Sequence, residues 1–512
     1  MIKTNVPAQA SHGHATRFTA RRIGIDTQHE AVVLMHKDCP VGRSEGFAAH
    51  NRVVLCVENR QVIATLYHVT TDLIGLHEAA LSETAWSRLG VQDGDYVDVM
   101  HPEPLRSMSY VRGWIYGAEF GQGELREIVG DVADGRYSDI QLSAFVTACS
   151  ARPLGRNEIL ALTQSMVEVG DRLNWNTDRV VDKHSVGGLP GNRTTPIVVP
   201  IIAALGLTIP KTSSRAITSP AGTADTMETL APVDLDTQAI HRVVEQEGGC
   251  IVWGGAVKLS PADDILVRIE RALDLDAEGQ LIASVLSKKI AAGSTHLVLD
   301  LPVGPTAKVR TEKAARMLSG ALISVAASFG LKTKAILGDG TQPIGRGIGP
   351  ALEARDVLAV LQGAADAPPD LRVRAVTLAG ALLELSELAD EGRGESMAAA
   401  ALDDGRAWAK FQRICEAQGG MRKPPTSSHR RPLIAERPGR VGRIDNRKIA
   451  MLAKLAGAPD AKAAGLELHV RLEDTVSARQ PLCTVHAEAP GELEYALAYA
   501  AANPDMISVV DQ

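Results

Sequence analysis

A glycine-rich segment carries the first residues of this chain that could do chemistry. It runs from Asp182 to Asn192 as DKHSVGGLPGN, after an expected strand and before an expected helix. Glycines let backbone N–H groups approach an anion closely, and a helix N-terminus adds partial positive charge. Lys183 supplies a full charge, while Ser185 and Thr195 supply hydroxyl donors. The pattern predicts a phosphate-binding loop, although it is not a Walker loop. A glycine-rich turn that binds nothing explains the spacing equally well.

A second segment is rich in hydroxyl side chains. Six of the thirteen residues from Lys211 to Thr223 are Ser or Thr, and the stretch also contains Arg215. A solvated loop would have the same composition, so composition alone does not make it a site. Its position favours a binding role, because it follows the expected strand 207–210, and loops at the carboxyl ends of parallel strands form the binding crevice of α/β proteins.

A third group of residues lies on a pair of expected helices. Ser284 and Lys288 are four residues apart and therefore share one helix face, and Asp276 lies just before that helix. A carboxylate, a hydroxyl and an amine that converge on a cleft could hold a heterocyclic base and protonate it. Without further context, a solvated face with a simple salt bridge is the better interpretation.

The elements that must position these residues alternate between strands and helices. Short β-rich runs at 179–182, 250–253, 297–300 and 335–337 alternate with helical patterns such as 194–205, where Pro200 should disturb the middle. This alternation predicts a parallel sheet covered by helices. Residues 105–176 and the helices near 261–286 show helical periodicity instead, which predicts a separate helical lobe.

The rest of the chain is predicted to form smaller units. Residues 20–100 contain β-rich runs at 32–35, 53–57, 62–66 and 96–99, residues 416–440 are expected to form a connection, and a strand is expected at 466–472. The fold class is therefore α/β, with a helical lobe and a large α/β lobe. The predicted domains are 1–100 (N-terminal, β-rich), 101–176 with 260–292 (helical lobe), 177–259 with 293–415 (α/β phosphate-binding lobe) and 440–512 (C-terminal, α+β).

Composition excludes several functional classes. The chain has 54 Lys and Arg against 61 Asp and Glu, a net charge of −7, which argues against a broad nucleic-acid surface. Six scattered cysteines without a CxxC pair argue against structural zinc and disulfides, and fit a reducing cytosol. The N-terminus lacks the apolar stretch of a secretory signal, and the longest apolar run, 197–210, is too short to cross a bilayer. We expect a cytoplasmic protein without a membrane or nucleic-acid partner.

Several ordered motifs together resemble the thymidine and pyrimidine-nucleoside phosphorylases, and most closely their AMP phosphorylase branch. These motifs are DKHSVGG, TSSRAITSPAGTAD, SPADD, SVLSKK and GTQPIG, and the resemblance runs from about residue 105 to the end. It implies a subunit whose two lobes close on a small nucleoside or nucleotide and inorganic phosphate. The phosphate is a co-substrate, and no cofactor or metal is implied. A homodimer or higher homo-oligomer is expected.

The resemblance also assigns roles to individual residues. Phosphate binding is implied for Lys183, Ser185, Thr195, Ser213 and Thr223. Contacts to the nucleotide are implied for Gly188, Ser214, Arg215, Ala216, Ile217, Thr218, Ser219, Thr223, Ser284 and Lys308, and Ser284 and Lys288 match residues that hold the base. Asp276 is the expected proton donor to the departing base, and His184 is the alternative.

Two departures from the thymidine enzymes bear on the substrate. The position where those enzymes place a pyrimidine-gripping Arg is Ile269 here by direct count, with Arg268 and Arg271 nearby. Their glycine-rich loop with a His reads AITSP at 216–220. We therefore expect phosphorolysis of a nucleoside 5′-monophosphate of the AMP, CMP or UMP type, which gives free base and ribose 1,5-bisphosphate. Thymidine phosphorolysis is the alternative. Two other classes are alternatives. A phosphoribosyltransferase would need carboxylates that hold a metal on pyrophosphate, and the 211–225 loop has no such acidic cluster. A non-catalytic nucleotide-binding regulator would release no free base when phosphate is added.

Overall fold

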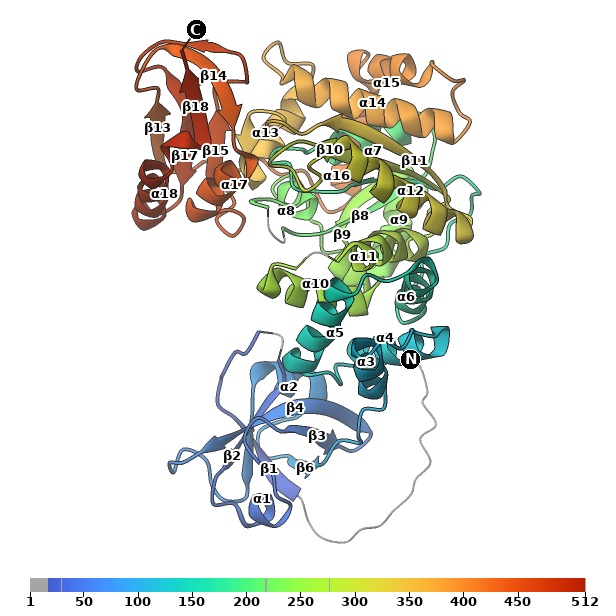
Figure 1. The fold of residues 1–512 in the computed structure, drawn as a ribbon, viewed down its shortest axis with the longest axis vertical. Coiled ribbons are helices and arrows are strands. Elements are labelled where there is room, and N and C mark those ends of the chain that lie inside the picture. The colour runs from blue at the N-terminus through green and yellow to red at the C-terminus, as the bar shows by residue number, and fades with distance from the viewer. Residues whose placement is uncertain (1–16, 29, 217–218, 276, 512) are drawn as a thin grey trace. The chain divides into compact units, whose positions relative to one another are not determined.

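A computed structural model describes residues 17–511, except positions 29, 217–218 and 276. The chain divides into two compact units, Met1–Tyr110 with Asp134–Gln141, and Val111–Ala133 with Leu142–Gln512 (Figure 1). The finer division into four domains remains a prediction.

The first unit is a closed β-barrel with strand order β1-β5-β2-β4-β3-β6. The expected runs at 32–35, 53–57, 62–66 and 96–99 all lie in its strands, and their inward side chains, such as Val33, Val53 and Leu66, are fully buried. The elements are β1 (Arg17–Arg22), β2 (Val32–His36), α1 (Pro40–Ser44), β3 (Arg52–Val57), β4 (Arg60–Val69), β5 (Glu78–Leu81), α2 (Glu83–Leu89) and β6 (Tyr96–Met100).

A helical layer follows the barrel in the chain, as the helical periodicity predicts. Helix α6 packs against both α4 and α11, so the helices near 261–291 join those near 107–168. The helices are α3 (Ser107–Ile115), α4 (Gln122–Ala133), α5 (Asp139–Ala151), α6 (Arg156–Glu168), α10 (Pro261–Leu273) and α11 (Glu278–Ala291).

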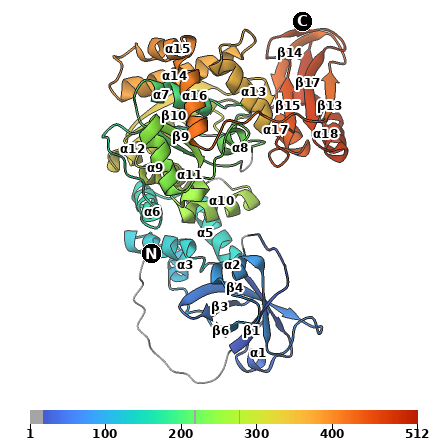
Figure 2. The same ribbon diagram turned by 180° about the vertical axis from the view of Figure 1, so that it is seen from behind.

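The predicted parallel α/β sheet is present. Strands pair in the orders β11-β10-β7 and β8-β9, all in parallel, and an isolated parallel bridge between Val180 and Thr208 connects the two groups. The strands are β7 (Val181–Ser185), β8 (Ile209–Ser213), β9 (Gly249–Trp253), β10 (His296–Val303) and β11 (Lys332–Asp339). Helices that contact these strands are α7 (Thr195–Ala204), α8 (Thr223–Glu228), α9 (Thr237–Glu247), α12 (Glu312–Ser328) and α14 (Pro369–Leu385) (Figure 2). Packed against these helices are α13 (Pro350–Leu361), α15 (Gly394–Asp403) and α16 (Arg406–Ala417).

Two local expectations in this region are wrong. Helix α7 continues through Pro200, because its whole surface is buried in the core of the α/β region and this packing compensates for the lost backbone hydrogen bond. Strands β7 and β8 also extend further than expected, to Ser185 and Ser213. The reason is pairing: β10 matches β7 as far as Asp300 with Ser185, and β9 matches β8 as far as Trp253 with Ser213.

The C-terminal part of the second unit is an α+β region with sheet orders β12-β15-β17-β13 and β16-β14-β18. The expected connection 416–440 contains β13, because its polar-looking residues pair along β17, and the strand expected at 466–472 ends at Leu468. The elements are β12 (Gly347–Ile348), β13 (His429–Ile434), β14 (Gly439–Ile444), α17 (Asn446–Leu455), β15 (Gly465–Leu468), β16 (Thr475–Val476), β17 (Pro481–Ala487), α18 (Pro490–Ala502) and β18 (Ile507–Val510). In the described part of the chain, no helix combines the length and apolarity needed to span a membrane.

Candidate active site

Strand β7 places the residues of the Lys-His-Ser motif on alternating faces of the sheet, because successive strand side chains point to opposite sides. Lys183 is buried, and its Nζ donates a hydrogen bond to Thr194 Oγ1 at 2.6 Å and lies 3.9 Å from the Asp300 carboxylate. Burial lowers the pKa of Lys183 to about 8. Lys183 is thus anchored between the sheet and the start of α7, where Thr195 is also buried.

Ser185 belongs to a polar network around Asp300 on the neighbouring strand. Asn192 Nδ2 donates to Ser185 Oγ at 3.1 Å and to the Asp300 carboxylate at 3.0 Å, and Arg374 also donates to that carboxylate. Burial alone would raise the pKa of Asp300, but Lys183 and Arg374 hold it below its usual value. Asp300 therefore stays ionised and fixes the groups around the glycine-rich loop.

The hydroxyl-rich segment begins at the carboxyl end of β8. Ser213 lies at that end, and its Oγ is buried without a hydrogen-bond partner among the described residues. Thr223 starts α8, and its Oγ1 accepts a hydrogen bond at 3.0 Å from Arg193, which also forms a 2.5 Å ion pair with Glu353. Buried polar groups are normally paired, so the Ser213 hydroxyl is suited to donate a hydrogen bond to a bound ligand.

The loop between Ser213 and Thr223 is held by its own ion pairs. Arg215 binds Glu228 through two 2.8 Å hydrogen bonds and lies over the Trp253 ring at 4.9 Å. The Ala216 N–H donates to Asp225 at 2.6 Å. Arg215 therefore shapes the loop in this structure, whereas the neighbouring Ser214 is exposed.

The remaining described part of this loop is also internally bonded. Ser219 Oγ donates to the Ala221 carbonyl at 2.9 Å. Gly222 lies directly on the loop backbone, since a Cβ there would be 2.5 Å from the carbonyl carbon of Arg215. Ile217 and Thr218, predicted as nucleotide contacts, lie outside the described residues, as does Asp276.

Gly188 and Lys308, two predicted nucleotide contacts, lie next to each other. Gly188 has a φ of +85°, and a Cβ on it would lie 2.9 Å from the backbone nitrogen of Lys308. Only glycine suits both this backbone conformation and this close approach. The glycine-rich loop after β7 therefore lies directly against the segment after β10.

Ser284 and Lys288 lie on α11, and Lys288 forms the expected salt bridge. Its Nζ is 2.6 Å from Asp263 and 3.2 Å from Asp264, both in the SPADD motif on α10. Although burial favours the neutral amine, these two carboxylates raise the pKa of Lys288 above its usual value. Ser284 is half-buried on the same helix.

Sequence reasoning missed several polar residues that organise this region. One signal was present, because Asp300 interrupts the apolar run of β10, and a carboxylate inside such a run needs buried partners. Asn192 and Arg374 bind Asp300, Lys289 binds Asp182, and Arg193 binds Glu353. The members of each pair are far apart in the sequence, so no local pattern links them. Among the described residues, no cluster of His, Cys, Asp and Glu could hold a metal ion.

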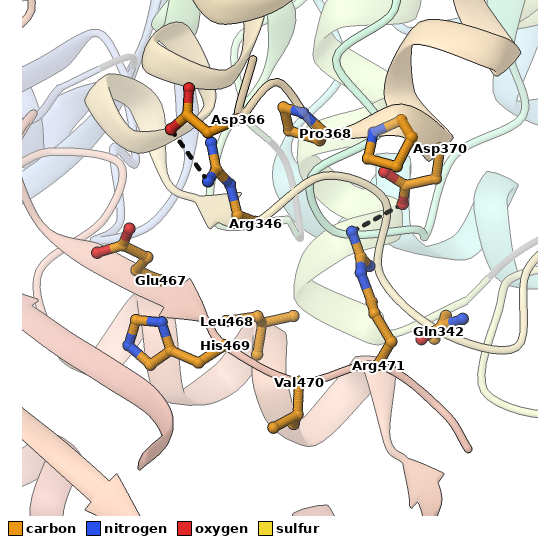
Figure 3. A pocket seen from close by; sticks show the side chains of 11 residues that line it. Gln342, Arg346, Asp366, Pro368, Asp370, Glu467, Leu468, His469, Val470 and Arg471 are labelled. Atoms are coloured by element: carbon orange, nitrogen blue, oxygen red, sulfur yellow. Dashed lines mark hydrogen bonds and ion pairs between the residues drawn. The ribbon is translucent and has the colours of Figure 1, made fainter. Parts of the chain in front are cut away.

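A cavity of about 490 Å³ lies away from these residues (Figure 3). It is lined by parts of the α/β region and of β15, and its charges are largely paired. Arg346 lies 3.4 Å from Asp366, and Arg471 lies 2.8 Å from Asp370. None of the predicted site residues lines it, so it is not the candidate active site.

Comparisons with known proteins match this arrangement region by region. Residues 109–170 match the helical bundle domain of a glycosyl transferase family, and residues 177–408 match the a/b domain of that family. Residues 440–505 match the C-terminal domain of pyrimidine nucleoside phosphorylases. A solved structure of anthranilate phosphoribosyltransferase from Thermus thermophilus shares the fold, with a TM-score of 0.51, 19% identity, and coverage of 60% of this chain and 98% of that chain.

Full-length relatives identify the family. A protein of Sphingopyxis alaskensis named "putative thymidine phosphorylase" is 61% identical over 497 residues, which cover 97% of this chain and 96% of the relative. A Legionella pneumophila protein of the same name is 56% identical, covering 96% of this chain and 94% of the relative. The chain is therefore an enzyme, and it belongs to the thymidine and pyrimidine-nucleoside phosphorylase family of pentosyltransferases.

Proposed function

We propose that this enzyme uses inorganic phosphate to cleave the N-glycosidic bond of a nucleoside 5′-monophosphate, releasing free base and ribose 1,5-bisphosphate. We further propose that phosphate is its only co-substrate and that no cofactor or metal takes part. The observation that carries the phosphate site is the unpartnered, buried hydroxyl of Ser213 at the carboxyl end of the parallel sheet. An anion there would satisfy this donor, and ligands of α/β proteins bind outside the carboxyl ends of the strands.

The phosphate side of the reaction depends on positioning. Phosphate attacks the anomeric carbon while the bond to the base breaks, so the sugar gains positive character and the base gains negative charge. A phosphate dianion held in line lowers the barrier by proximity and by its charge. Lys183 is fixed by Thr194 and Asp300, and Ser185 is fixed by Asn192. Both side chains are thus pre-organised to receive an anion.

The base side of the reaction needs a hydrogen-bond or proton donor for the departing nitrogen. Asp276 is our proposed donor and His184 the alternative, and Ser284 and Lys288 hold the base. Lys288 keeps its charge because Asp263 and Asp264 flank it. A charged ammonium can stabilise negative charge on the base only if the ion pair leaves one of its three hydrogens for the ligand.

The preference for a 5′-phosphate rests on two observations. Ile269 is a buried residue on α10, so the position matching the pyrimidine-gripping Arg of thymidine enzymes serves the core here. On the sugar side, the exposed Ser214 and the Lys308 segment against Gly188 offer hydroxyl, cationic and backbone donors. A second phosphate uses such donors, whereas a bare 5′-hydroxyl does not.

Thymidine phosphorolysis, which yields thymine and 2-deoxyribose 1-phosphate, is the second candidate. It is favoured by the names of the full-length relatives. The two candidates share the phosphate site and the base-side donors, and they differ only in what the sugar carries.

A substrate panel separates these possibilities. Purified enzyme is incubated with thymidine, uridine, AMP, CMP or UMP at equal phosphate concentration, and free base is quantified by chromatography. Reactions without phosphate and with EDTA are the controls. We expect base release only with phosphate, unaffected by EDTA, and the highest kcat/KM for a monophosphate. Cleavage of thymidine without cleavage of any monophosphate would overturn the nucleotide proposal and support the second candidate. No phosphate-dependent base release from any substrate would overturn both.

A further inference from the structure

Two buried lysines share one carboxylate directly behind the Lys-His-Ser motif. Lys211 Nζ, on β8, is 3.0 Å from Asp182 Oδ1, and Lys289 Nζ, on α11, is 2.7 Å from Asp182 Oδ2. The three residues are 5%, 3% and 1% exposed, respectively. When both lysines are protonated, the cluster therefore carries one positive charge that no carboxylate within it balances.

This cluster lies on the same face of β7 as His184. Asp182 and His184 are two residues apart in a strand, so their side chains point the same way, whereas Lys183 points to the opposite side. The charged groups that act on the His184 ring are Lys289 from α11, Lys211 from β8, and Asp182 and Lys183 from β7 itself. On β9, burial raises the pKa of the Cys250 thiol to about 12, so that group is neutral. Three cations and a single anion thus act electrostatically on the ring.

These charges determine whether Lys289 or His184 is protonated first as the pH falls. Burial, assisted by Lys211, lowers the pKa of Lys289 to about 7 against the opposing pull of Asp182. Burial, and then Lys289 and Lys211, hold the pKa of His184 well below its usual value. Lys289 therefore takes up a proton before His184 can, and the charge it gains further disfavours protonation of the ring.

We propose that Lys289 and Lys211 are positioning residues that keep the His184 imidazole neutral throughout the working pH range. The ring then offers the departing base an N–H hydrogen bond, not the proton of an imidazolium. A neutral imidazole can stabilise developing negative charge in this way by donating its N–H hydrogen bond. This inference rests on the proposed function only in taking the departing base as the group that accepts the hydrogen bond from the ring.

Histidine NMR of the full-length enzyme without substrate tests the proposal. The chain is labelled with ¹³C at histidine Cε1, the His184 signal is assigned from a His184→Gln variant, and the spectra are recorded from pH 4.5 to 8.5. We expect the wild-type His184 signal to show no inflection near the usual histidine midpoint of about 6.5. In Lys289→Met, one carboxylate faces one lysine, and the His184 midpoint should rise by about 1–3 units.

Two further variants make the result decisive. If Lys289→Met does not fold, Lys211→Met removes the same excess charge and should raise the midpoint in the same way. Lys410→Met is the matched control, because Lys410 Nζ also lies 3.0 Å from a buried carboxylate, that of Glu247 on α9, and its loss should leave the His184 signal unchanged. A wild-type inflection near pH 6.5, or an unmoved midpoint in folded Lys→Met variants, would overturn the proposal.

The pH dependence of kcat/KM gives a second measurement. The wild type should show no acidic limb from His184, whereas Lys289→Met should lose activity below its new histidine midpoint. The NMR measurement requires no substrate. If no nucleoside or nucleotide is cleaved, the proposed function fails, while the titration still decides whether the lysines keep His184 neutral.

Discussion

Replacing Ser213 with alanine should impair phosphate use without destabilising the protein. Ser213 is 8% exposed, and its Oγ is buried without a hydrogen-bond partner in the described part of the chain. In the free enzyme the hydroxyl therefore contributes no hydrogen bond to stability and bears the cost of its own desolvation. In the phosphate complex the same hydroxyl would donate to a charged oxygen.

The substitution should therefore weaken phosphate use but not lower the free energy of unfolding. A hydrogen bond to a charged group is worth about 1.5–3 kcal/mol, and each 1.4 kcal/mol is a factor of ten, so kcat/KM for phosphate should fall by roughly 10- to 100-fold. An unsatisfied buried hydroxyl costs about 1–3 kcal/mol, so its removal should leave the free energy of unfolding unchanged or raise it by up to roughly 1 kcal/mol.

Initial rates at varied phosphate and thermal melts of the same preparations provide the assay. Ser82→Ala is the matched control: Ser82 is also buried, but its Oγ accepts hydrogen bonds from the Ala85 and Val32 N–H groups and caps α2. Losing this cap should cost about 0.5–2 kcal/mol of stability and leave phosphate saturation unchanged. An unaltered phosphate saturation curve in Ser213→Ala would refute our placement of the anion.

Further predictions concern the other proposed groups. Lys183→Met should raise KM for phosphate by about 10- to 100-fold in initial-rate measurements, since it removes a buried charge-assisted donor; an unchanged KM would argue against it. Asp276→Asn should lower kcat by about 10²- to 10⁴-fold while substrate KM stays near wild type. A near-normal kcat would show that another group donates the proton. Hydrogen bonds from Arg215, above all other groups, lower the pKa of Glu228 to about 2, so the stability this pair contributes is present above the carboxyl's usual pKa and lost as the pH falls. Glu228→Gln should therefore melt below the wild type at pH 7, with a gap that narrows in melts from about pH 4.5 towards about pH 2; a constant gap would contradict this.

Much of the fold follows from local patterns. The β-rich runs of the barrel, the alternation of strands and helices, and the start of α10 at Pro261 were all readable because period and turn residues are local properties. The ends of β7 and β8 were not readable in this way. Residues such as His184 and Lys211 are polar, and only pairing with neighbouring strands makes them strand residues.

The candidate site shows the same division between local and distant information. The glycine-rich loop and the hydroxyl-rich segment could be found in the sequence, since both depend on residues close together. The partners of Asp182 come from β8 and α11, and the Arg374 partner of Asp300 comes from a helix 74 residues away. No spacing rule links such positions, because the fold alone brings them together.

These distant partners have one consequence that the motifs alone do not suggest. Asp182 and Asp300 each form ion pairs with two cations. Lys211 and Lys289 pair with Asp182, and Lys183 and Arg374 pair with Asp300. When all four are protonated, these cations exceed the two carboxylates by two positive charges, one on each face of β7. Burial penalises this excess, which is why the pKa values of Lys183 and Lys289 are low without a ligand. A phosphate dianion would balance part of this charge, so the cations favour binding of the co-substrate we propose.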